Sequence, residues 1–280
     1  MSGQTSSSER EVQSQVDGKR LLLDVRRDGA TARLVINRPE KKNALSNAML
    51  DELNRALDAS IADPAVRTIV ISGAGPCLSA GRDTKEFSGA ARLHDQTLDG
   101  NQAGFLKLLG TLMHAPKPTI AAAHGYAFGA GQAITLACDF VVAERGTRFG
   151  NVEMAYGFPA SMNVVLLTRH LGRRLGLEIA MTGDTYTAER YYEIGLVNRL
   201  AEPGKLDDAV AAFCASLNER TPWSIARTKE TYHIAEEQDG AAALHTGNQL
   251  NQLLMLQSQT APVHSGNAAV RRSIGTRADD

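Results

Sequence analysis

The chain has 280 residues, 43% of them apolar, which is enough for one large hydrophobic core, or for one core with a small appended part. Its 30 basic and 31 acidic residues give a formal net charge of −1 without any block of like charge, which argues against nucleic acid or an anionic membrane as a partner. The three cysteines, Cys77, Cys138 and Cys214, have no CxxC spacing, which argues against a disulfide framework and a zinc site and fits a reducing cytoplasm.

The N-terminal segment MSGQTSSSEREVQSQVDG, residues 1–18, carries acids and has no apolar core. It therefore differs from a secretory signal and from a transit peptide, and we expect a disordered tail. In the rest of the chain, charges or glycines interrupt every apolar run before it reaches the roughly 18 residues that a membrane span needs. The sequence thus predicts a soluble protein.

The first half of the chain mixes strand and helix patterns. LLLDVRRDGATARLVIN, residues 21–37, predicts a β-hairpin with its turn at Asp28-Gly29. From Ser46, a good N-cap, apolar residues recur at helical spacing as far as the breaker Asp63-Pro64. Short buried strands are expected at 67–73, 118–125, 139–144 and 147–150, with a helix at 104–115.

Beyond Pro159 helical patterns dominate. They cover residues 161–183, 187–195, 206–220 and 222–238, and only GLVNRL at 195–200 breaks the series. Strands and helices mixed early, followed by helices alone, indicate an α/β core with a helical C-terminal part.

Two glycine-rich turns follow buried strands, GAGPCLSAG at 73–81 and GAGQAI at 129–134. Neither is a dinucleotide-binding fingerprint, because the sixth position is Leu78 or Ile134, and neither continues as a P-loop. The glycines alone could serve only to make tight turns. However, the helix that begins near Gly129 presents unpaired backbone N–H groups at the positive end of its dipole, which suits a developing oxyanion.

Five segments in this order resemble the enoyl-CoA hydratase/isomerase (crotonase) superfamily over roughly residues 21–200. They are INRPEKKNALS, ISGAGPCLSAGRDTKEF, KPTIAAAHGYAFGAGQAITLACDFVVAERGTRFGNVEM, GFPA and AERYYEIGLVNRL. The resemblance implies a crotonase-like spiral of repeated β-β-α units at 19–200, and a helical region at 201–280 for trimerisation and for a lid. It also implies a cytoplasmic homotrimer or dimer of trimers that acts on an acyl-CoA thioester, with coenzyme A as part of the substrate and neither a metal nor a separate cofactor.

The resemblance also implies the site residues. The backbone N–H groups of Arg82 and Ala130 would hold the thioester carbonyl. KKNAL would lie against the adenine end of coenzyme A through Lys42 and Ala44, although lysines in such loops are usually only solvated. The remaining substrate contacts are expected from the two turns, at Ala80, Asp83, Thr84, Lys85 and Gly129. The loop GAARLHDQTLDG, residues 89–100, is expected to shape the acyl pocket.

Family hydratases carry two glutamates, one in the helix after the glycine turn and one after the FG pair. Here Ala133 stands at the first place and Glu153, in FGNVEM, at the second. Hydration divides its work between two carboxylates, whereas isomerisation needs one base that removes a proton and returns it two carbons away. The sequence therefore favours isomerisation somewhat over hydration, with Glu153 as the acid/base in apolar surroundings supplied by Met154, Phe158, Ile134 and Phe128.

Two alternatives stay open. The missing first glutamate is compatible with a weakly active or non-catalytic acyl-CoA binding protein, and Glu153 could also activate water for thioester hydrolysis. Tyr126, Tyr156 and His124 lie near the motifs, but aromatic and histidine side chains beside tight turns commonly serve packing or hydrogen bonding.

Overall fold

The computed structural model describes residues 15–16, 19–86 and 97–260. The predicted disordered tail, residues 1–18, lies outside this part of the chain except for β1 (Gln15–Val16), which pairs with β2 (Lys19–Arg20) as a two-stranded antiparallel sheet. Most of the predicted acyl-pocket loop, 89–96, also lies outside the described residues.

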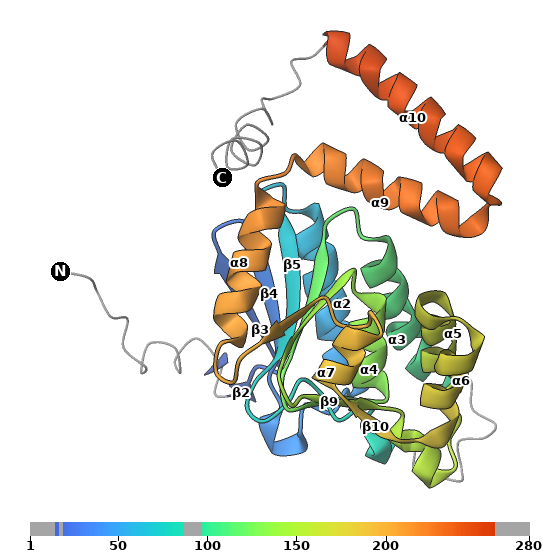
Figure 1. The fold of residues 1–280 in the computed structure, drawn as a ribbon. Coiled ribbons are helices and arrows are strands. Elements are labelled where there is room, and N and C mark those ends of the chain that lie inside the picture. The colour runs from blue at the N-terminus through green and yellow to red at the C-terminus, as the bar shows by residue number, and fades with distance from the viewer. Residues whose placement is uncertain (1–14, 17–18, 87–96, 261–280) are drawn as a thin grey trace, which may run out of the picture.

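A six-stranded sheet forms the centre of the fold (Figure 1). Its order is β11 (Arg199–Ala201), β8 (Phe140–Glu144), β6 (Thr119–Ala123), β5 (Thr68–Gly73), β4 (Thr31–Ile36) and β3 (Leu23–Asp28). The strands β3 and β4 are antiparallel and pair from Leu23↔Ile36 to Asp28↔Thr31, which confirms the predicted hairpin. All other neighbouring pairs are parallel, which confirms the expected α/β class.

Helices cover both faces of this sheet. On one face lie α2 (Asn47–Ala62), α3 (Thr97–His114) and α4 (Ala130–Ala137), and on the other lies α8 (Leu206–Asn218) (Figure 1). Successive strand residues point to opposite faces. Ile69 and Ile71 accordingly join the larger core cluster under α2, whereas Val70 joins the smaller cluster under α8.

Local signals account for the bounds of α2. Ser46 caps its start, since its Oγ accepts a hydrogen bond from the N–H of Met49 at 3.2 Å. The helix ends before Asp63-Pro64, as predicted, because proline disfavours a helical conformation in the residue before it.

A second, three-stranded sheet is short and was predicted only in part. Its order is β10 (Thr185–Thr187), β9 (Arg148–Gly150) and β7 (Tyr126–Phe128). Only β9 was expected from the sequence. Because β7 and β9 are parallel neighbours, the glycine turn after β7 lies beside the end of β9, where Gly129 donates its N–H to the carbonyl of Gly150 at 2.9 Å. From there the chain enters the 3-10 helix η4 (Val152–Tyr156), which bears Glu153.

The second half is helical, as predicted. It contains α5 (Ser161–Leu171), α6 (Arg173–Thr182), α7 (Ala188–Glu193), α9 (Pro222–Glu237) and α10 (Gly240–Thr260). The expected helix at 161–183 is divided at Gly172, which has a φ of 70°. In Figure 1, α9 and α10 form a helical hairpin beyond one end of the sheet, and α10 extends away from the core. The trimerisation and lid roles expected for 201–280 stay predictions.

Among the residues that the structure describes, no helix is both long and apolar enough to span a membrane. The same part of the chain contains no group of three or more His, Cys, Asp or Glu side chains that could hold a metal ion. All three cysteines are buried and free.

Candidate active site

The two glycine turns pack against each other, backbone to backbone. A Cβ atom on Gly81 would lie 3.1 Å from the carbonyl oxygen of Phe128 and 3.6 Å from the backbone nitrogen of Ala130. A Cβ atom on Gly131 would lie 2.7 Å from the carbonyl oxygen of Ser79. The absence of side chains thus lets these turns touch. Arg82, which follows Gly81, and Ala130, the first residue of α4, are consequently close in space.

The KKNAL segment lies alongside the first of these turns. Ala80 donates its N–H to the carbonyl of Lys42 at 2.9 Å, and Leu45 donates to the carbonyl of Gly81 at 2.8 Å. Ala44 and Ala80 are half-buried, whereas the side chain of Lys42 is exposed. The structure therefore places four of the predicted substrate-contact positions, Lys42, Ala44, Ala80 and Asp83, on two neighbouring segments that are hydrogen-bonded to each other.

The side chain of Asn43 anchors the KKNAL segment to the first glycine turn, and the sequence analysis missed this role. Asn43 is fully buried, with a φ of 54°, a conformation that asparagine tolerates better than most residues. Its Nδ2 donates to the carbonyls of Ala74 at 2.8 Å and Cys77 at 2.7 Å. Its Oδ1 accepts the N–H of Arg38 at 2.9 Å. Its place within the KKNAL motif was the available signal, but two of its three partners, Ala74 and Cys77, lie more than thirty residues further along the chain.

The side chains of Arg82 and Asp83 turn to structural partners. The Arg82 guanidinium donates to the carbonyl of Leu45 at 3.1 Å and to Oδ1 of Asn47 at 2.7 Å, at the start of α2. The Asp83 carboxylate accepts from Nη2 of Arg38 at 3.1 Å. Thr84 and Lys85 begin the 3-10 helix η2 (Thr84–Glu86) and are exposed.

Glu153 lies beside the second glycine turn. A Cβ atom on Gly129 would be only 3.0 Å from Oε2 of Glu153. Oε1 accepts a long hydrogen bond of 3.3 Å from Nδ2 of Asn163. Oε2 is buried and has no hydrogen-bond partner among the described residues. Burial raises the pKa of the Glu153 carboxyl, and hydrogen bonds, among them the one from Asn163, oppose that rise.

The apolar surroundings expected for Glu153 are only partly present. Ile134 is fully buried in the main core, and Met154 packs against that core. Phe128 stacks on Tyr126, with ring centroids 4.9 Å apart. Phe158 is 62% exposed, so in this chain alone it does not shield the carboxylate.

The helix α4 has neither an acid nor a base in its second turn. Ala133 is fully buried and belongs to the main core. Next to it, the fully buried Gln132 donates to Oδ1 of Asn151 at 3.0 Å and accepts from the hydroxyl of Tyr191 at 2.9 Å. Asn151 in turn donates to the carbonyl of Ile179 at 2.9 Å. This buried amide network, Gln132, Asn151 and Tyr191, joins α4 to the segment that leads into Glu153.

The other polar candidates near the motifs have structural partners or lie open to solvent. A ring nitrogen of His124 is 2.9 Å from the carbonyl oxygen of Gly75. Tyr156 is 78% exposed. Burial raises the pKa of Tyr126 to about 12, so this phenol stays protonated at neutral pH.

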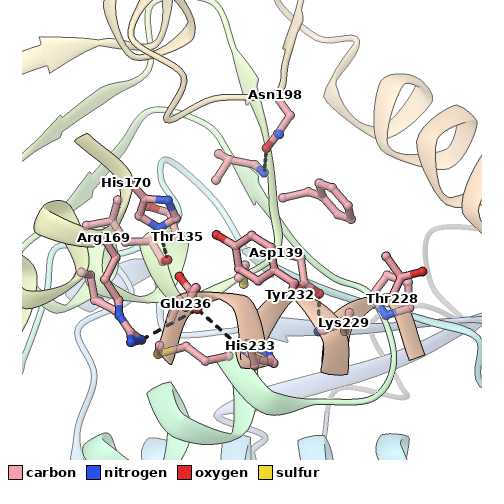
Figure 2. Close-up of a pocket in the computed structure, with 18 of the residues that line it drawn as sticks. Thr135, Asp139, Arg169, His170, Asn198, Thr228, Lys229, Tyr232, His233 and Glu236 are labelled. Atoms are coloured by element: carbon pink, nitrogen blue, oxygen red, sulfur yellow. Dashed lines mark hydrogen bonds and ion pairs between the residues drawn. The ribbon is translucent and has the colours of Figure 1, made fainter. Parts of the chain in front are cut away.

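A cavity of about 640 Å³ lies elsewhere, between the C-terminal end of α4, α5 and α9. Figure 2 shows Asp139 and Lys229 on its wall, and their carboxylate oxygen and Nζ are 2.6 Å apart. The same Asp139 oxygen accepts from the N–H and hydroxyl of Thr119. None of the predicted site residues lines this cavity. The glycine turns and this cavity thus lie at opposite ends of α4.

Comparison with known proteins assigns the family. The sequence profile described as "Enoyl-CoA hydratase/isomerase" matches residues 26–265. The 2,3-dehydroadipyl-CoA hydratase of Escherichia coli is 31% identical over 252 residues, which are 88% of this chain and 94% of that protein. The mitochondrial enoyl-CoA hydratase of Pongo abelii is 32% identical over 203 residues, which are 72% of this chain and 68% of that protein.

Solved structures agree with this assignment. A crystal structure of an enoyl-CoA hydratase from Mycobacterium smegmatis superposes with a TM-score of 0.81 at 29% identity, covering 91% of this chain and 97% of that one. The chain therefore belongs to the enoyl-CoA hydratase/isomerase family and has the crotonase fold.

Proposed function

We propose that the chain binds an acyl-CoA thioester and moves its double bond by proton transfer, as an enoyl-CoA isomerase. The observation that carries the proposal is the Glu153 carboxylate. It is partly withdrawn from water, and its Oε2 has no hydrogen-bond partner within the described part of the chain. It also lies directly against the turn at Gly129 and Ala130. Such a carboxylate is suited to accept a proton.

In this mechanism the two glycine turns stabilise the negative charge that develops on the thioester oxygen. The backbone N–H groups of Arg82 and Ala130 would donate to the thioester oxygen as negative charge develops on it. The packing of the two turns supports this pairing, since a Cβ atom on Gly81 would lie only 3.6 Å from the backbone nitrogen of Ala130. Removing one donor from such an oxyanion hole typically costs on the order of 100- to 1000-fold in rate. Both donors belong to the backbone, so the side chains at 82 and 130 need not take part.

Glu153 would then carry the proton. In a 3-enoyl thioester, Oε2 removes a proton from the α-carbon, and the electron pair of that C–H bond passes into the enolate. The same oxygen returns the proton to the γ-carbon, and the double bond moves into conjugation with the carbonyl. One carboxyl group is sufficient for both steps, which agrees with the alanine at position 133.

Hydration is the second candidate, because the relatives described above are hydratases by name. It would require Glu153 to deprotonate the attacking water and to deliver a proton to the α-carbon without help from position 133. Two further alternatives are thioester hydrolysis with water activated by Glu153, and binding of acyl-CoA with little turnover.

A substrate panel separates these functions. The full chain would be incubated with 2-enoyl and 3-enoyl thioesters of several lengths. Isomerisation of a 3-enoyl thioester increases the absorbance of the conjugated enoyl group, hydration of a 2-enoyl thioester decreases it, and hydrolysis releases free coenzyme A that a thiol reagent detects. We expect conjugation of 3-enoyl thioesters to be the fastest reaction. Faster hydration or release of coenzyme A would contradict isomerisation, and binding without turnover would contradict an enzyme.

We also propose that the chain assembles as a trimer or a dimer of trimers through α9 and α10. Several large apolar side chains on these helices are exposed, namely Trp223, Tyr232, Leu244, Leu253 and Met255. Exposed apolar patches commonly mark protein interfaces. Light scattering with size-exclusion chromatography would give the mass, and a monomer at micromolar concentration would contradict the proposal.

A further inference from the structure

Asn163 is the only described side chain outside η4 that bonds to the Glu153 carboxylate in this structure. It lies in the first turn of α5 and is 3% exposed. Its Nδ2 is 2.9 Å from the carbonyl oxygen of Gly129 and 3.3 Å from Oε1 of Glu153. We infer that Asn163 is a positioning residue, which holds the carboxylate of the proposed base in a fixed relation to the turn that carries Ala130. The inference rests on the function proposed above.

The chemistry of these contacts fixes the orientation of the amide. Both neighbouring atoms, a carbonyl oxygen and a carboxylate oxygen, are acceptors. The NH₂ group has two hydrogens and can serve both, whereas Oδ1 in that place would face two other oxygens. Asn163 therefore donates one hydrogen to the carbonyl of Gly129 and the other to the Glu153 carboxylate.

The contact with Gly129 joins the base to the oxyanion turn. The carbonyl of Gly129 also accepts the N–H of Ala133 at 3.0 Å, which is the first hydrogen bond of α4. Ala130, the predicted oxyanion donor, is the next residue after Gly129. One amide group thus ties the start of α4 to Glu153, and a shift of either would break one of its two hydrogen bonds.

The contact with Glu153 also divides the roles of the two carboxylate oxygens. Oε1 receives the amide hydrogen, which leaves Oε2 to exchange a proton with the substrate. A hydrogen bond donated to a carboxylate favours its charged form, so Asn163 restrains the rise in the pKa of Glu153 that burial causes. No charged side chain of the described residues contributes to that shift.

Two variants and a matched control test this role. Asn163→Ala removes both donors, while Asn163→Asp keeps the shape and places a second carboxyl group beside Glu153. Asn54 is the control because it is also a buried asparagine whose Nδ2 donates to two carbonyls, those of Leu50 at 2.9 Å and Gly104 at 2.8 Å. Asn54→Ala therefore reports the cost of losing such an amide away from the site.

The first readout does not need turnover. The full chain would be labelled with ¹³C at the glutamate carboxyl carbons, and the resonance that disappears in Glu153→Gln would be followed against pH. We expect its titration midpoint to move to higher pH in Asn163→Ala and further in Asn163→Asp, because a second carboxylate disfavours the charge on Glu153. The midpoint should stay unchanged in Asn54→Ala. Asn163→Asp keeps the test available if the alanine variant fails to fold.

The second readout is the rate with a 3-enoyl thioester. We expect kcat to fall about 10- to 100-fold in the Asn163 variants, the range of a hydrogen bond to a charged group, with a much smaller change in KM. If Glu153→Gln is inactive but both Asn163 variants match wild type in midpoint and in kcat, the positioning role is wrong and the proposed function survives. Full turnover by Glu153→Gln would overturn the proposed function, and the positioning role with it.

Discussion

Gly129 and Glu153 lie so close that a side chain at position 129 would press on the Glu153 carboxylate. A Cβ atom there would be 3.0 Å from Oε2 and 3.5 Å from the carboxyl carbon of Glu153. The backbone of Gly129, with φ 51° and ψ −113°, is also a conformation that other residues rarely adopt. Contact and conformation together make this glycine a sensitive probe of the site.

We therefore expect Gly129→Ala to lower turnover, because the Glu153 carboxylate must shift by a few tenths of an ångström to make room for the methyl group. Gly146→Ala is the matched control, since Gly146 also has a positive φ, 79°, but a Cβ atom there would meet nothing within 4 Å. Backbone strain at either glycine costs roughly 1–3 kcal/mol. Urea unfolding and initial rates would separate strain from site damage. Equal rate losses in both variants would show that the contact with Glu153 is unimportant.

The raised pKa of Glu153 predicts a pH-dependent contribution to stability. In the folded chain the carboxyl binds its proton more tightly than in the unfolded chain, because burial disfavours its charge. Between the unfolded and folded pKa values the free energy of unfolding therefore falls as pH rises. Glu153→Gln removes this titration. We therefore expect the Tm of the variant, measured relative to that of wild type, to rise as the pH goes from acid to neutral.

The control for that experiment is Glu178→Gln, a change at an exposed glutamate on α6. Because this side chain is exposed, the variant reports what the same amide substitution does to Tm away from the site. A Tm difference for Glu153→Gln that does not change with pH would mean that the Glu153 carboxyl is solvated in the folded protein.

The buried amide network gives a prediction about stability. Tyr191→Phe removes the hydroxyl that donates to Oε1 of Gln132 and leaves that oxygen buried without this donor. An unsatisfied buried acceptor costs about 1–3 kcal/mol, so the free energy of unfolding should fall by that amount. The neighbouring Tyr192 is 51% exposed, and Tyr192→Phe should change it little. Equal stability of both variants in urea would mean that the network contributes nothing.

A substitution at position 133 tests whether the missing first glutamate is the reason that the chain would isomerise rather than hydrate. In Ala133→Glu a second carboxyl would stand near Glu153, and mutual repulsion would leave one acid and one base. We expect hydration of a short 2-enoyl thioester to rise above the native level. Because Ala133 is fully buried, the larger side chain should also cost about 1–3 kcal/mol of stability.

Ala133→Gln controls for size, since it adds the same bulk without the carboxyl group. Circular dichroism would check folding of both variants. A folded Ala133→Glu protein that hydrates no faster than Ala133→Gln would show that position 133 does not face the reacting carbons.

The sequence predicted those elements whose signals are local. The hairpin at Asp28-Gly29, the cap at Ser46 and the stop at Asp63-Pro64 each depend on a few adjacent residues, and each is present. The strands β7 and β10 were not predicted, and β10 pairs with β9 across more than thirty residues of chain. Pairing of that kind depends on tertiary contacts that adjacent residues do not reveal.

The candidate site divides in the same way. Glu153 and the glycine turns belong to recognisable motifs, and the structure brings them together. Asn163 stands in SMNVVLLTRHL, which reads as an ordinary helix, and its importance arises only when α5 packs beside Gly129. Asn43 likewise gains two of its three partners, Ala74 and Cys77, from a segment more than thirty residues away.

The most direct test of the account is the turnover of Glu153→Gln with a 3-enoyl thioester, measured with its affinity for a non-reacting acyl-CoA by calorimetry. The amide keeps the shape of the side chain and removes the base, so kcat should fall about 100- to 10,000-fold while the affinity stays near that of wild type. Glu178→Gln should keep native activity. A folded Glu153→Gln protein that converts the substrate at a near-native rate would contradict Glu153 as the base, and with it the proposed mechanism.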